Sequence, residues 1–179
     1  MGVVVLVATL AGCSGPSRDP VPTAAAAPFI CDGVPQAGMA LILGAPVKTT
    51  QDVGRWGDKS QGFHCNVIRE DDLGGAVLVA DEDLRDVAPT HGEEGQRAHL
   101  KSQANPAQID ADSDGWGYVY GNRGDQIAAW VCNGRYITVD LVSVDVEVRD
   151  PRADAQALLV SMLPWACGGE KVPEGTVGR

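Results

Sequence analysis

The chain contains 179 residues, including five cysteines, and has a formal net charge of −10. This length suits one domain, and a hydrophobic fraction of 44% supplies a packed core and excludes wholesale disorder. An acidic sequence with a pI near 4.6 is a poor partner for nucleic acid phosphates. No stretch reaches the ~18 apolar residues that a membrane-spanning helix requires.

The first residues are typical of an export signal. Residues 3–11 form an almost unbroken apolar run that ends in Leu10-Ala11-Gly12-Cys13. This ending resembles a bacterial lipobox, so we predict a lipoprotein signal peptide over residues 1–12 and lipidation of Cys13. No Lys or Arg precedes Arg18, although signal peptides normally begin with a basic segment, and we therefore expect an upstream start. The alternative is a buried N-terminal strand with an ordinary thiol.

The segment after Cys13 is poor in bulky apolar side chains. Residues 14–28 contain four prolines, which fix φ and remove backbone donors, so neither a helix nor a strand is expected there. We predict a lipidated Pro/Ala tether over residues 13–28, with a reach of ~50 Å. Residues 29–170 are predicted to form one globular domain, and residues 171–179 a flexible tail.

Four cysteines remain in the domain once Cys13 is set aside. An even number in an exported chain favours two disulfides. The absence of a CxxC pair and of a close His/Cys cluster disfavours zinc and redox chemistry. We favour the pairs Cys31–Cys65 and Cys132–Cys167, each of which would tie one end of an expected helix to an expected strand. The alternative pairing is Cys65–Cys132 with Cys31–Cys167.

Two helices are expected in the first two thirds of the domain. The first spans Asp32–Leu43, with Asp32 as its N-cap and Gly44 as the residue that ends it. The second begins at a capping box, Thr90-His91-Gly92-Glu93, and continues as a short polar helix to Gln103.

Five strands are predicted from alternation of apolar side chains and from turn signals. They lie at residues 63–67, 76–80, 116–120, 126–132 and 135–148. Asn133-Gly134, between the last two strands, predicts a two-residue type I′ turn. The last strand changes phase near Leu141 and Val142, so we expect a β-bulge there, or a strand buried on both faces beyond it.

A final helix begins with Asp150 as its cap and Pro151 as its first residue, and Pro164 is expected to end it. One apolar stripe recurs at helical spacing, formed by Ala155, Leu158, Leu159, Met162 and Leu163. Together the elements predict an α+β fold: an antiparallel sheet of about five strands, helices packed on one face, and two disulfides.

The order of these features resembles the small exported lipoproteins of actinobacteria. The residues that carry the resemblance are Cys13, Cys31 in FICDGVP, Cys65 in FHCNV, Trp130–Cys132 and the helix from Asp150. In those proteins a lipobox and tether precede a cysteine at the first helix, and a second cysteine lies in the first strand. They share no known catalytic set, so the resemblance implies location and fold rather than an activity.

One acidic loop resembles a calcium-binding loop. Asp110, Asp112 and Asp114 are followed by Gly115, which reproduces the first six positions of that motif, so the three carboxylates are candidate calcium ligands. The twelfth position is Gly121 instead of a bidentate Glu. A solvated acidic loop before a strand explains the same residues. We therefore expect no metal and no cofactor, with calcium as the alternative.

Other candidate chemistry is sparse. The sequence has no GxSxG, HExxH or phosphate-binding glycine loop, and we expect no catalytic residues. The sequence also contains four aromatic candidates: Trp56, Trp116, Tyr118 and Tyr120. We favour pairing of these side chains across strands over the alternative that they line a cleft. The acidic residues between Glu70 and Glu94 favour a solvated face over a site for a cationic partner.

These observations predict a lipid-anchored cell-envelope protein on the outer face of the cytoplasmic membrane, or a secreted one. We expect a non-enzymatic domain that binds an envelope protein or a small ligand through the sheet face or a loop groove. The alternatives are an exported hydrolase that uses acidic loop residues, and a purely structural envelope component. The expected partners are the membrane, through the anchor, and this ligand, but not nucleic acid.

Overall fold

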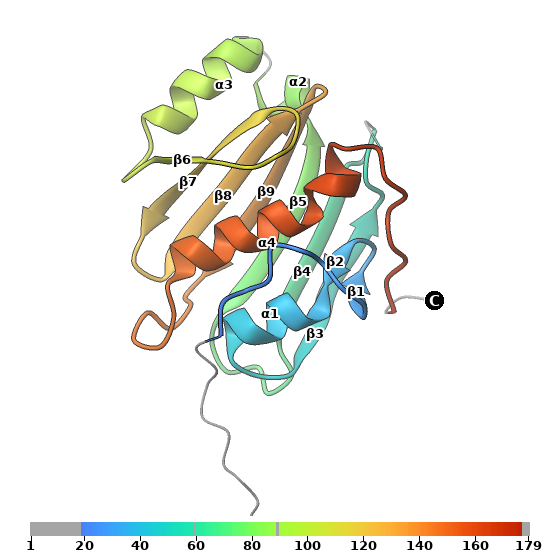
Figure 1. Ribbon diagram of the computed structural model, residues 1–179, viewed down its shortest axis with the longest axis vertical. Helices are drawn as coiled ribbons and strands as arrows, with labels where there is room; N and C mark the ends of the chain where they lie inside the picture. The colour runs from blue at the N-terminus through green and yellow to red at the C-terminus, as the bar shows by residue number, and fades with distance from the viewer. Residues whose placement is uncertain (1–18, 59, 89, 177–179) are drawn as a thin grey trace, which may run out of the picture.

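The computed structural model describes residues 19–58, 60–88 and 90–176. A seven-stranded antiparallel sheet has the order β3-β4-β5-β9-β8-β7-β6, and β1 and β2 form a separate hairpin (Figure 1). The prediction of an α+β antiparallel fold is confirmed, but the large sheet exceeds the expected five strands. The strands are β1 (Phe29–Cys31), β2 (Val34–Pro35), β3 (Val47–Gly54), β4 (Phe63–Arg69), β5 (Ala76–Asp83), β6 (Ala107–Ile109), β7 (Trp116–Asn122), β8 (Asp125–Cys132) and β9 (Arg135–Val142).

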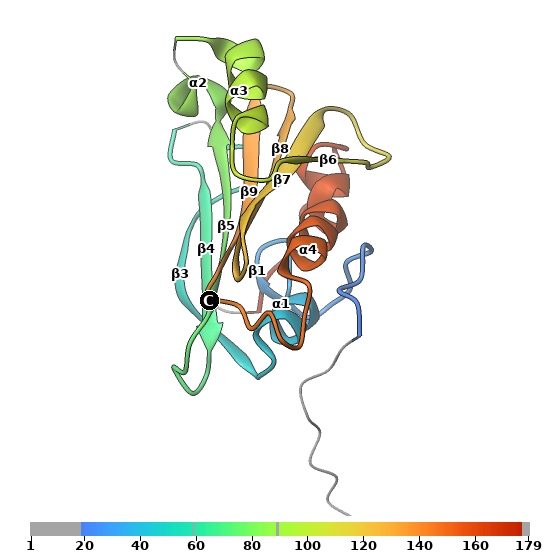
Figure 2. The same cartoon turned by 90° about the vertical axis from the view of Figure 1, so that its left-hand side faces the viewer.

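Helices lie on both faces of the large sheet (Figure 2). α1 (Gln36–Leu43) and α4 (Pro151–Ala166) cover the inner face, and the main core lies beneath them. α2 (Leu84–Val87) and α3 (Gly92–Lys101) lie at one end of the opposite, outer face. The expectation of helices on a single face is therefore wrong for α2 and α3. These two helices shield a second cluster of large aromatic side chains from water.

The strands expected from alternation are present. In β4 the alternate residues Phe63, Cys65 and Val67 are buried on the inner face. The β8–β9 turn has φ of 51° at Asn133 and 74° at Gly134, the left-handed pair that a type I′ turn requires. This turn sets the register between β8 and β9, near the centre of the sheet.

The phase change in the last strand has a simpler origin than a bulge or double burial. β9 ends at Val142, and Ser143 takes a φ of 54° that turns the chain out of the sheet. Val144 is then buried through a separate contact, because its N–H donates to the Gly124 carbonyl at 3.1 Å. Val146, further along the expected strand, is 46% exposed.

Two of the expected helix starts are displaced. α1 begins at Gln36, and the carboxylate of Asp32 accepts from the Gly175 N–H at 2.7 Å instead of capping the helix. Gly44 ends α1 in a left-handed conformation, as predicted. α3 begins at Gly92 without a side-chain cap, because the carboxylate of Glu93 accepts from Trp116 Nε1 at 2.5 Å.

α4 begins as predicted. The carboxylate of Asp150 accepts from the backbone N–H groups of Arg152 and Ala153 at 3.1 and 3.3 Å, and the apolar stripe is buried. Pro164 does not end the helix, which continues to Ala166. The burial of the residues that follow Pro164 offsets the one backbone hydrogen bond that a proline removes.

Both favoured disulfides are present. Cys31–Cys65 joins β1 to β4, and Cys132–Cys167 joins the end of β8 to the end of α4. Two disulfides in one domain indicate an oxidising, extracytoplasmic location. None of the helices in the described ranges is long and apolar enough to cross a membrane.

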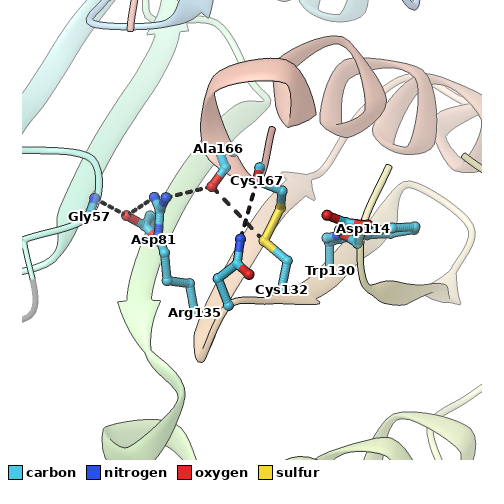
Figure 3. Close-up of a disulfide and its surroundings, with 9 residues drawn as sticks. Gly57, Asp81, Asp114, Trp130, Cys132, Arg135, Ala166 and Cys167 are labelled. Atoms are coloured by element: carbon cyan, nitrogen blue, oxygen red, sulfur yellow. Dashed lines mark hydrogen bonds and ion pairs between the residues drawn. A yellow bond between two sulfur atoms is a disulfide. The ribbon is translucent and has the colours of Figure 1, made fainter. Parts of the chain in front are cut away.

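Arg135 connects β9 with β5, with α4 and with the turn after β3 (Figure 3). Its guanidinium donates to both carboxylate oxygens of Asp81 and to the carbonyl of Ala166. The Gly57 N–H donates to the same carboxylate at 2.7 Å. The Asp81 side chain is 2% exposed and that of Arg135 is 15% exposed, so little water screens this pair.

The two disulfides should stabilise the domain to a similar extent, because their sequence separations are 34 and 35 residues. Chain entropy predicts that Cys31→Ala/Cys65→Ala and Cys132→Ala/Cys167→Ala each lower the free energy of unfolding by about 4 kcal/mol. Urea unfolding of the wild type and of both variants measures these changes in the free energy of unfolding. A loss below ~1 kcal/mol in either variant would contradict the assigned contribution of that bridge.

Removal of Asp81 should be costly. Asp81→Ala leaves the Arg135 charge buried without its carboxylate, and we expect a loss of about 3 kcal/mol in the free energy of unfolding. The control is Asp72→Asn, which suits the positive φ of 57° at this position and removes an ion pair with Lys48; the Asp72 and Lys48 side chains are 66% and 41% exposed. That change should cost less than about 1 kcal/mol in the same urea titration. Equal losses would show that the buried pair has no special role.

Candidate functional site

The outward side of α4 carries few charged side chains. Between Asp154 and the end of the helix the sequence contains no charged residue. A surface helix normally carries charged side chains on its outer side. Here most outward positions are small or apolar and half-buried to exposed, namely Ala153, Ala157, Val160 and Pro164, and the polar Gln156 is uncharged. This surface is suited to contact with a bound molecule.

A hollow of about 510 Å³ lies on this side of α4. Ala153, Ala157 and Val160 contribute its floor, and the segment at residues 20–23 forms one wall. Residues 148–150 line one end. Figure 2 shows the N-terminal segment beside α4, on the side away from the sheet.

A second hollow, of about 680 Å³, adjoins the first, since Thr23 and Val160 line both. It continues past Pro164 to Glu170, and the loop between β6 and β7 forms its other wall. We call the two together the α4 groove. Its floor from Ala153 to Pro164 is about 17 Å long at the helical rise per residue.

The N-terminal segment is attached to the domain over part of the predicted tether. Val21 is 4% exposed and belongs to the core, and the carbonyl of Asp19 accepts from the Arg149 guanidinium at 3.0 Å. Arg149 also pairs with Asp154, with 2.6 Å between Nε and Oδ2. The predicted signal peptide (residues 1–12), Cys13 and the tether up to residue 18 lie outside the described residues.

The C-terminal segment, predicted as a tail, also contacts the domain in its described part. The N–H and hydroxyl of Thr176 donate to the carbonyl of Phe29, at 2.8 and 2.9 Å. The carbonyl of Pro173 accepts from the Gly33 N–H at 2.8 Å. Residues 177–179 lie outside the described part.

The three candidate calcium ligands are not gathered at one point. All three are exposed, and Asp110 lines the first hollow, whereas Asp112 and Asp114 line the second. Trp130 Nε1 donates to the carbonyl of Asp114 at 3.0 Å, which fixes the loop against β8 (Figure 3). Within the described ranges, no group of three His, Cys, Asp or Glu side chains is placed to hold a metal ion. The loop instead forms an acidic wall of the α4 groove.

The aromatic candidates are mostly packing residues. Trp116 and Tyr118 are buried beneath α3, and Trp56 stacks on Phe63 with 4.6 Å between ring centroids. Tyr136 is buried in the same outer cluster, and burial raises the pKa of its hydroxyl far above the usual value. A phenol held neutral in this way is unsuited to act as a nucleophile near neutral pH.

The outer face beyond α3 carries a row of half-buried side chains. The pairing of β4, β5, β9 and β8 aligns Asn66, Leu78, Asp140 and Ile127 across the sheet. Burial raises the pKa of the Asp140 carboxyl, and the nearby charge of Asp125 raises it further. This flat row contrasts with the α4 groove, which is hollowed and has two walls.

Comparisons of the chain with protein-family models, with curated proteins and with solved structures found no match. The assignment of a site therefore depends on the geometry of this chain. Sequence motifs do not predict the α4 groove, although the sequence contains one signal of an unusual helix surface. That signal is the run without charge after Asp154, which leaves the rest of α4 without a charged side chain on any side.

The raised pKa of Asp140 predicts that Asp140→Asn increases the free energy of unfolding, and that the increase depends on pH. An acid whose pKa is higher in the folded state destabilises that state once it ionises, so the cost is present at pH 7. The cost is absent below the unfolded pKa of about 3.9, where both states are protonated. Urea unfolding should show Asp140→Asn stabilised at pH 7 and unchanged at pH 3. The exposed control Asp112→Asn should show no such difference, and an equal effect of Asp140→Asn at both pH values would contradict the assignment.

Proposed function

We propose that the protein is a lipid-anchored binding domain of the cell envelope and that its ligand site is the α4 groove. The observation that carries this proposal is the apolar outward side of α4, lying as a floor between two walls. Such a concave, partly apolar surface with polar groups at its rim is the usual form of a ligand site. The two disulfides agree with an extracytoplasmic location.

The arrangement of the acidic side chains supports binding over hydrolysis. General acid and base catalysis needs two carboxyl groups that face one substrate at a defined separation. Asp110 lines one hollow, Asp112 and Asp114 line the other, and all three are exposed to solvent. Carboxylates spread along a wall in this way suit recognition of a ligand by charge.

The proposed anchor lies close to the groove in the chain. Asp19 is attached to the domain by Arg149, and it lies six positions after Cys13 in the chain. Six residues span at most ~20 Å. A lipid on Cys13 would therefore keep the groove near the membrane surface, far closer than a tether of sixteen free residues would.

The anchor is tested by Cys13→Ala in the producing cell. We expect the wild type to incorporate labelled palmitate and to fractionate with membranes, and Cys13→Ala to lose both properties. Ser14→Ala, the neighbouring control, should keep both. An unlabelled wild type, or a Cys13→Ala chain that is still labelled, would refute lipidation at this position.

The groove is tested with the neutral apolar dye N-phenyl-1-naphthylamine. Its fluorescence should rise on binding to the wild type and fall several-fold with Ala157→Glu, because a carboxylate on the floor opposes an apolar occupant. The control Ala98→Glu places the same charge on the exposed side of α3. Equal dye binding by both variants, at unchanged Tm, would refute the groove as the site.

A further inference from the structure

The lining of the α4 groove has one dominant sign of charge. Its exposed acidic residues lie on the wall formed by the β6–β7 loop and at both ends: Asp110, Asp112, Asp114, Asp150 and Glu170. The one basic residue among those that line the two hollows is Arg149, and its side chain is 5% exposed and paired with Asp154. The groove thus joins an apolar floor to an acidic rim, with the Arg149 charge already matched by a carboxylate.

The shape of the groove selects among possible occupants. Both hollows are open to solvent along α4, and the floor of about 17 Å matches about five residues of extended chain or three turns of helix. A single acyl chain would be better served by a closed apolar cavity than by an open channel with carboxylates along one wall. An elongated segment with two kinds of side chain fits both the length and the chemistry.

We propose that the α4 groove binds a cationic, amphipathic peptide segment of a partner protein. Apolar side chains of the segment would lie on Ala157 and Val160, and its Lys or Arg side chains would face Asp110, Asp112 and Asp114. This inference rests on the proposed function, because it specifies the ligand of the same groove. Charge complementarity of this kind speeds association and rejects anionic partners.

The acidity of the whole chain makes a matched control necessary. With a net charge of −10, the protein attracts any cationic peptide to some degree. The groove variant Asp110→Asn/Asp112→Asn/Asp114→Asn neutralises three carboxylates on the rim. The control variant Glu70→Gln/Asp86→Asn/Glu94→Gln neutralises three exposed carboxylates on residues that do not line the groove. Both variants have the same net charge, so a difference between them reports position.

The experiment measures Kd by fluorescence anisotropy at physiological ionic strength. The probes are a short amphipathic Leu/Lys peptide and the same peptide with Glu in place of each Lys. The protein is purified from the envelope in phosphatidylcholine nanodiscs, and empty nanodiscs give the blank. We expect the Leu/Lys peptide to bind at least about tenfold more tightly than the Leu/Glu peptide. The groove variant should weaken its binding about tenfold, as three exposed charge pairs would, and the control variant by less than about twofold.

Two results would overturn the inference. Equal weakening by the groove and control variants would show non-specific attraction to an acidic protein, and equal binding of the two peptides would show that charge does not select the ligand. If the apolar dye still binds in an Ala157-dependent manner, either result removes the peptide proposal and leaves the proposed function standing. If the dye also fails, the groove itself is refuted.

Discussion

α4 packs its apolar stripe onto β8 and β9, and both of its ends are fixed by contacts that resist separation. At its N-terminal end Arg149 and Asp154 form a buried ion pair that also binds the carbonyl of Asp19. At its C-terminal end Cys167 is bonded to Cys132, and Arg135 binds the last turn. Because the helix cannot shift, the N-terminal segment and the β6–β7 loop keep fixed positions on either side of it. The groove is the result of this placement.

The parts of the fold that follow from local signals could be predicted from the sequence. Asn133-Gly134 determines its own turn, and the cap at Asp150 needs only the N–H groups two and three residues further on. The disulfide pairing favoured from the sequence is the one present, although the sequence left an alternative open and the first bridge joins strand β1 to strand β4. The signals failed where a distant partner competes for the same group. Asp32 binds Gly175, and Glu93 binds Trp116, instead of capping the expected helices.

The strands and the candidate site that were not predicted lack a clear signal within their own stretch of sequence. β3 is an edge strand with polar Thr50 and Gln51 exposed, so it carries little of the alternation that reveals a half-buried strand. The α4 groove is formed by three segments far apart in the chain, and no motif describes it. The acidic loop resembles a calcium motif because the spacing of its three aspartates can be seen within one short stretch of sequence. Its role as a wall depends on the helix across from it.

The C-terminal segment has a consequence for the chemistry of the first disulfide. Gly175 lies directly over Cys31, so closely that an added Cβ would be 2.5 Å from the Cys31 carbonyl carbon. Cys31 is 0% exposed and Cys65 is 1% exposed. A thiolate must reach a sulfur in line to exchange with it, and the burial of both cysteines hinders that approach. Exchange at this bridge therefore requires local opening of the part of the domain where residues 173–176 pack against β1.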